Sequence, residues 1–117
     1  MRKPALYKSF FHAFRGLFLM LKSERNFQLE LLALLTNIVL ILILRLSTTD
    51  TVLILMLCAM VLITEILNTC IEKICDFIHP DFDVRIGKIK DMAAGAVVLS
   101  AILSVIAGAF IYSKYVL

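Results

Sequence analysis

Three long runs of apolar residues dominate the pattern of the chain, and polar residues are largely confined to the segments between them. The runs cover residues 29–46, 52–71 and 92–112. A helix needs roughly 20 apolar residues to cross about 30 Å of hydrocarbon, and each run approaches or reaches that length. The pattern therefore predicts three membrane-spanning helices.

The segment before the first run has a different period, with apolar residues every three or four positions and cations between them. The apolar positions are Leu6, Phe10, Phe14, Leu17 and Leu21. This spacing predicts an amphipathic helix over about residues 4–22, lying in the membrane interface with its cations towards anionic headgroups. Such a helix could act only as an anchor, or it could also cover a site. Ser23 follows it as a candidate cap for the first span.

Composition supports a membrane protein. The chain is 62% hydrophobic, whereas a soluble domain averages roughly 45–50% apolar residues. The predicted fold is therefore an all-α integral membrane protein, with a surface helix and three spans in one domain covering residues 1–117.

The distribution of cations predicts the orientation of the spans. Ten of the twelve Lys and Arg residues precede the first run or lie between the second and third runs, and the other two are Arg45 and Lys114. Because positively charged connections stay in the cytoplasm, we expect a cytoplasmic N-terminus and a C-terminus outside.

Four polar residues at the end of the second run share one helix face. Glu65, Asn68, Glu72 and Asp76 stand at positions i, i+3, i+7 and i+11, which align on a helix. An acid within a membrane span costs roughly 2.5–3.5 kcal/mol on insertion scales. Glu65 therefore needs a partner, a proton or a catalytic role.

The spacing of this face permits phosphoryl transfer. About 10 Å separates the backbones of Glu65 and Glu72, which leaves room for a cation and a phosphate. Magnesium is commonly held by one or two carboxylates plus substrate phosphates, and Glu24 could join Glu72 from the mouth of the first span. Glu65 could accept a proton from an alcohol in the bilayer. Phosphate charge could be neutralised by the cations between the second and third runs, which are Lys90 together with Lys73, Arg85 and Lys88.

Two other classes of protein also use a membrane glutamate. A small proton-coupled transporter would need Glu65, although it has no use for a polar face that continues to Lys90. A non-enzymatic scaffold subunit could use Glu65 for pairing across an oligomer. In the third run, small residues recur every fourth position, which predicts close helix packing and assembly. They are Ala96, Ser100, Ser104 and Gly108.

Three sequence blocks carry a resemblance to a known family. They are SERNF at residues 23–27, EILNTCIE at 65–72 and KDMAAGAV at 90–97. These blocks resemble the signatures of the prokaryotic diacylglycerol kinase family, which includes the undecaprenol kinases, and the likeness runs from about residue 9 to 108. It implies a homotrimer in the bacterial inner membrane that uses ATP and Mg²⁺ to phosphorylate a lipid alcohol, with no nucleic-acid partner.

The same resemblance implies a role for individual residues. Glu65 is the general base supported by Asn68, and Glu24 and Glu72 hold magnesium. The implied nucleotide-binding residues are His12, Glu24, Glu72, Asp76, Asp81, Asp83, Lys90 and Asp91. The implied lipid-substrate residues are Phe27, Gln28, Glu30, Glu65 and Ala94. In two departures from the family pattern, Asp83 stands where a histidine is common, and Ala5 lacks the basic side chain of some members.

The acceptor lipid stays open between two alcohols. The forms ERNF and AAGAV favour the undecaprenol branch, whereas the triplet KDM also occurs in the diacylglycerol branch. Both alcohols present a hydroxyl group on a long apolar tail, so Glu65 need not distinguish them.

Overall fold

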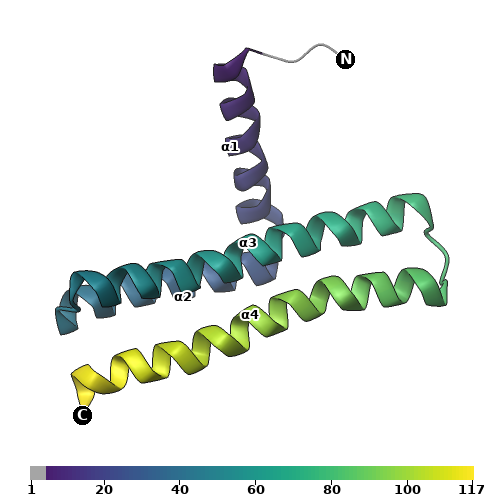
Figure 1. The fold of residues 1–117 in the computed structure, drawn as a ribbon. Helices are drawn as coiled ribbons and strands as arrows, with labels where there is room; N and C mark the ends of the chain where they lie inside the picture. Colours follow the sequence, from purple (N-terminus) through teal and green to yellow (C-terminus); the bar gives the residue numbers. More distant parts are fainter. Residues whose placement is uncertain (1–4) are drawn as a thin grey trace.

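The computed structural model describes residues 5–117, which form four helices and no strand. Figure 1 shows α1 (Leu6–Ser23), α2 (Arg25–Leu44), α3 (Thr48–Ile78) and α4 (Val84–Val116). The helices α2, α3 and α4 are each long and apolar enough to cross a membrane. The prediction of an all-helical protein with three long apolar helices is confirmed. The first residue of the predicted surface helix, residue 4, lies outside the described part of the chain.

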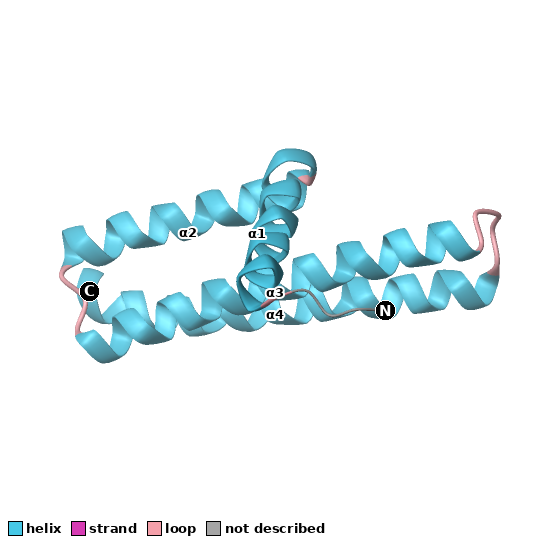
Figure 2. Cartoon of the chain, turned by 90° about the horizontal axis from the view of Figure 1, so that it is seen from above, coloured by secondary structure: helices cyan, strands magenta, loops and turns pink. Residues whose placement is uncertain are grey.

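The three apolar helices pack in chain order. Contacts join α2 to α3 and α3 to α4, while α1 contacts the start of the bundle through α2. Figures 1 and 2 show α3 and α4 side by side over their length, with α1 leaving the bundle at a steep angle. The α3–α4 hairpin continues well past the level of α1. The helices α3 and α4 are about 46 and 50 Å long, which is more than the roughly 30 Å thickness of a hydrocarbon core.

Little of the chain is buried within the bundle. One small core joins Ile41, Ile54 and Ile111 near the α2–α3 connection. Most other large apolar side chains on the spans are exposed. Lipid offers such side chains an apolar environment, so helices in a membrane need no large internal core.

The connection between α1 and α2 is a single extended residue. Glu24 occupies the N-cap position of α2 but forms no side-chain cap, while the Ser23 hydroxyl donates to the Leu19 carbonyl at 2.6 Å. The prediction that Ser23 caps the first span is therefore wrong. Its hydroxyl bonds back into α1, because the chain turns one residue later than predicted.

At one end of the bundle, polar side chains fasten α3 to α4. The Asp50 carboxylate accepts hydrogen bonds from the Tyr115 hydroxyl at 2.6 Å and the Lys114 ammonium at 3.0 Å. The backbone N–H of Ser47 donates to the same Tyr115 hydroxyl at 3.0 Å, and the Ser47 hydroxyl caps α3 by accepting from the Asp50 N–H. We call this group of Ser47, Asp50, Lys114 and Tyr115 the terminal clasp.

Small residues of α4 pack against α3 within the chain. The Ser100 and Thr64 hydroxyls lie 3.1 Å apart, and the Ser104 hydroxyl donates to the Leu57 carbonyl at 3.3 Å. These short side chains let the two backbones approach closely. Two members of the predicted small-residue stripe thus serve intrachain packing.

Candidate active site

The predicted polar face of α3 forms the buried centre of the site. Glu65 is 4% exposed and Asn68 is 8% exposed. The Asn68 amide donates to the Glu72 carboxylate at 3.4 Å. The Thr69 hydroxyl donates to the backbone carbonyl of Glu65 at 2.9 Å. Helical periodicity therefore brings Glu65, Asn68 and Glu72 together, as their spacing predicted.

The start of α2 adds further polar groups to this centre. The Glu24 carboxylate and the Asn26 side chain both lie near enough to the Glu65 carboxyl to interact with it. Glu30, one turn after Asn26, also lies near enough to Glu65 for their charges to interact. Asn26 is a site residue that the sequence pattern alone does not single out, although its i, i+4 spacing with Glu30 places both side chains on one helix face.

Two buried oxygen atoms of this centre have no hydrogen-bond partner within the described residues. They are Oε2 of Glu30 and Oδ1 of Asn68. Buried polar atoms in proteins are nearly always bonded, so an exception indicates a missing proton, water, ion or ligand. The centre is thus suited to bind a group that supplies donors or positive charge.

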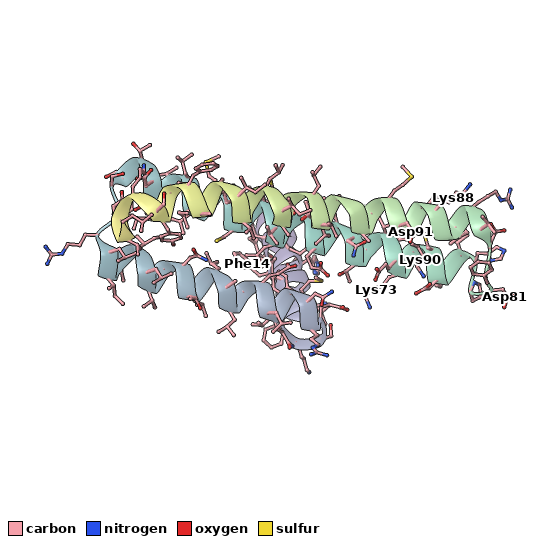
Figure 3. All side chains as sticks on the ribbon, turned by 90° about the horizontal axis from the view of Figure 1, so that it is seen from below. Phe14, Lys73, Asp81, Lys88, Lys90 and Asp91 are labelled. Carbon is pink, nitrogen blue, oxygen red and sulfur yellow. The ribbon has the colours of Figure 1, made fainter. Side chains whose placement is uncertain are left out.

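A cavity of about 530 Å³ lies where α3 and α4 meet, and we call it the hairpin cavity. Its lining includes six of the eight residues predicted to bind nucleotide: Glu72, Asp76, Asp81, Asp83, Lys90 and Asp91. The Lys90 ammonium donates to the Asp76 carboxylate at 2.7 Å across the hairpin. Figure 3 shows Asp81, Lys90 and Asp91 at this end of the hairpin.

Two predicted nucleotide-binding residues lie outside the hairpin cavity. Glu24 belongs to the buried centre, where its carboxylate lies 3.6 Å from the Lys73 ammonium. His12 lies on α1 with its ring centroid 6.2 Å from that of Phe11. The single chain therefore does not bring His12 to the hairpin cavity.

Asp83 lines the hairpin cavity, but its carboxylate already interacts with Arg85. Its carboxylate accepts from the Arg85 backbone N–H at 2.8 Å, which caps α4, and lies 3.3 Å from the Arg85 guanidinium. Hydrogen bonds from the Arg85 side chain and backbone lower the pKa of Asp83, because they stabilise its charged form. The residue that departs from the family pattern thus has a structural role at the helix start.

A second cavity, of about 420 Å³, lies between α2, α3 and α4, and we call it the bundle cavity. Its lining is mostly apolar and includes Ala33, Val61, Ala101 and Gly108, with Glu30 contributing a carboxyl group. A hydrogen bond of 2.7 Å from the Tyr112 hydroxyl to the Asn37 side chain links α4 to α2 at this cavity. An apolar space with few polar groups suits the hydrocarbon part of a lipid.

The predicted lipid-substrate residues are not gathered in one place. Glu30 lines the bundle cavity, whereas Ala94 lines the hairpin cavity. Phe27 is buried on α2. The Gln28 amide donates to the Leu21 carbonyl at 2.8 Å, so Gln28 secures the junction between α1 and α2.

The site has suitable groups for magnesium without forming a closed metal cage. Within residues 5–117, no group of three His, Cys, Asp or Glu side chains is close enough to hold a metal ion. Magnesium is often bound by only one or two carboxylates, with waters and phosphates as its other ligands. Glu24 and Glu72 both lie near Glu65, and two such carboxylates fit that kind of site.

Comparison with known proteins identifies the class as the membrane lipid kinases. Residues 11–112 match the model of the family described as prokaryotic diacylglycerol kinase, and the chain belongs to that family. It is 35% identical over 106 residues to an undecaprenol kinase of Bacillus subtilis, covering 91% of this chain and 86% of the relative. It is also 33% identical over 106 residues to a diacylglycerol kinase of Synechocystis, covering 90% of this chain and 61% of the relative.

These matches confirm the resemblance seen in the sequence blocks. The chain is a lipid kinase with three membrane helices.

Proposed function

We propose that the chain uses MgATP to phosphorylate the hydroxyl group of a membrane lipid alcohol, with undecaprenol as the favoured acceptor. The observation that carries this proposal is the burial of Glu65 on α3 between the two cavities. Val61, one turn before Glu65, lines the bundle cavity, and Glu72, two turns after it, lines the hairpin cavity. A lipid from the bilayer and a nucleotide from the water can thus approach one carboxyl group from different sides.

In the proposed reaction, Glu65 is the general base. Its carboxylate accepts the proton of the lipid hydroxyl as that oxygen forms a bond to the γ-phosphorus of ATP and the bond to the ADP oxygen breaks. The protonated Glu65 then returns its proton to water. A positioned general base typically contributes 10²–10⁴-fold to the rate. Asn68 orients the Glu72 carboxylate through its amide hydrogen bond.

The remaining residues bind and orient the two substrates. Glu24 and Glu72 would hold Mg²⁺, which supplies positive charge to the phosphates as the transition state forms. The proposed nucleotide-binding residues are His12, Glu24, Glu72, Asp76, Asp81, Asp83, Lys90 and Asp91. The proposed lipid-substrate residues are Phe27, Gln28, Glu30, Glu65 and Ala94.

We also propose that the protein is a homotrimer in the bacterial inner membrane, with its N-terminus in the cytoplasm and α1 lying in the interface. The steep angle of α1 to the bundle supports an interfacial position. The exposed apolar side chains of the spans are available to neighbouring chains. A neighbouring chain could also bring His12 to the hairpin cavity.

Undecaprenol is favoured over diacylglycerol for two reasons. The sequence blocks ERNF and AAGAV favour that branch. In addition, the chain covers more of the undecaprenol kinase than of the diacylglycerol kinase, at 86% and 61% of their lengths.

Phosphorylation of defined lipids tests the proposal. Purified protein in lipid vesicles is given labelled ATP and Mg²⁺ with undecaprenol or diacylglycerol, and parallel samples lack Mg²⁺ or acceptor. We expect labelled lipid phosphate only in complete samples, with undecaprenol the better acceptor at equal concentration. Labelling of diacylglycerol alone would reverse the acceptor assignment. Absence of label with both lipids would contradict the kinase proposal and favour a transporter or scaffold.

A further inference from the structure

We propose that Lys73 neutralises Glu24 when no metal is bound and turns to the nucleotide phosphates when the metal complex arrives. Lys73 would then be a positioning residue that exchanges one anionic partner for another. This inference rests on the proposed function, because it assumes that Glu24 holds the metal of a bound nucleotide.

The first observation is the contact between Lys73 and Glu24. Their ammonium and carboxylate groups lie 3.6 Å apart and link α3 to the start of α2. Glu24 also lies near Glu65, so a negative charge on Glu24 makes a negative charge on Glu65 less favourable. A cation at Glu24 reduces that repulsion, and Lys73 supplies one without a metal.

The second observation is that Lys73 is held loosely. Its side chain is 70% exposed, whereas that of Glu24 is 28% exposed. Exposed ion pairs are weak, and lysine is a point charge on a flexible four-carbon stem. Figure 3 shows Lys73 extending away from α3, on the opposite side of the hairpin from Lys88. Its ammonium group can therefore leave Glu24 without a change in the backbone.

The third observation is the shortage of free positive charge around the hairpin cavity. Its lining has one lysine and five carboxylates, from Glu72, Asp76, Asp81, Asp83 and Asp91. The lysine, Lys90, is bound to Asp76 at 2.7 Å. A polyphosphate entering this cavity would meet mainly negative charge. Lys73 lies outside this lining, but it stands three residues before Asp76, which lines the cavity. Residues three apart are neighbours on a helix surface, so the long side chain of Lys73 can add a cation at the cavity edge.

Counter-ion exchange gives Lys73 opposite effects on the two ligands. In the nucleotide-free protein, Lys73 competes with a divalent cation for Glu24 and weakens metal binding. In the nucleotide complex, Lys73 contributes an attractive charge and strengthens ATP binding. A side chain with a purely structural role would not produce effects of opposite sign.

The test compares Lys73→Met with Lys73→Arg and with the control Lys88→Met. Methionine keeps most of the length of lysine but lacks its charge. Lys88 is exposed on the same hairpin and forms no ion pair within residues 5–117. Binding of Mn²⁺ to nucleotide-free protein is measured from the electron paramagnetic resonance signal of free Mn²⁺. The KM for MgATP is measured on the same preparations.

We expect Lys73→Met to bind Mn²⁺ roughly two- to fivefold more tightly, as loss of an exposed ion pair predicts. Its KM for MgATP should rise by roughly tenfold, as expected for loss of a charged contact. Lys73→Arg and Lys88→Met should stay within about twofold of the wild type for Mn²⁺.

Mn²⁺ binding that is unchanged or weaker in Lys73→Met than in the wild type would overturn the inference. So would Mn²⁺ binding that is as tight in Lys73→Arg as in Lys73→Met. If the wild type phosphorylates lipid in those samples, the proposed function still stands. If the wild type phosphorylates no lipid, the proposed function fails together with the nucleotide part of the inference. An unchanged KM for MgATP in Lys73→Met would overturn only the nucleotide part of the inference, that Lys73 turns to the phosphates.

Discussion

The buried centre contains polar groups that the helices leave incompletely bonded. Oε2 of Glu30 and Oδ1 of Asn68 have no partner within the described residues, although both atoms are buried. In a membrane protein such groups are costly and usually functional. In the proposed reaction, a lipid hydroxyl would donate to the first, and a donor or cation delivered with the nucleotide would satisfy the second.

At this scale, the proposed role of Glu72 as a magnesium ligand makes a prediction about metal affinity. We expect Glu72→Gln to raise the Mg²⁺ concentration needed for half-maximal lipid phosphorylation by roughly tenfold or more, because a charged ligand becomes neutral. Glu72→Asp keeps the charge and should recover part of the affinity. The measurement is a Mg²⁺ titration at saturating ATP. An unchanged midpoint in Glu72→Gln would show that Glu72 is not a metal ligand.

Residue spacing predicted part of the site and missed another part. Glu65, Asn68 and Glu72 belong to one helix, so the helical period alone placed them together. The proximity of Asn26 to Glu65 and the ion pair of Lys73 with Glu24 were missed, because both depend on how α2 packs against α3 after the turn at Glu24. Such packing between helices is not encoded in the period of either one.

Among the helices, the terminal clasp holds the bundle at the end opposite the hairpin cavity. There the Asp50 carboxylate binds Lys114 and Tyr115, so the start of α3 is tied to the end of α4. The Tyr115 hydroxyl also accepts from Ser47, which fixes the connection from α2. The clasp therefore sets the relative positions of the helices that line the bundle cavity.

Removing the charge of the clasp should destabilise the bundle without removing a site residue. We expect Asp50→Asn to lower the melting temperature in detergent by roughly 5 °C, and Tyr115→Phe to lower it by less. Ser113→Ala is the control, because within residues 5–117 its hydroxyl bonds to the Phe110 carbonyl of its own helix and to no residue of the clasp. Melting is followed by circular dichroism. Equal melting temperatures for Asp50→Asn and the wild type would show that the clasp contributes no stability.

The apolar runs predicted the helices but not their ends. The second run covers residues 52–71, whereas α3 extends from Thr48 to Ile78. Hydrophobicity marks the part of a helix that contacts hydrocarbon, and polar residues extend the helix beyond it. Ser47 and Asp83 begin α3 and α4 by accepting backbone hydrogen bonds. These caps are recognisable in the sequence only once the connections are known.

For the whole molecule, the long α3–α4 hairpin separates an apolar space from a charged one. The bundle cavity lies among the three spans, and the hairpin cavity lies where α3 and α4 meet near their connection. Glu65 lies on α3 between the two linings. Sequence alone gave the three spans and their polar face. It could not give the cavities, because their shapes depend on the angles between helices.

The central claim is that Glu65 transfers a proton and does not merely hold the fold. The decisive measurement compares lipid phosphorylation and ATP binding in Glu65→Gln and the wild type, using the same reconstituted protein. If Glu65 is the general base, we expect Glu65→Gln to lower the rate of lipid phosphorylation by at least about 100-fold. The Kd for MgATP should stay within a few-fold of the wild type. A variant that phosphorylates lipid at a rate near that of the wild type would contradict the account.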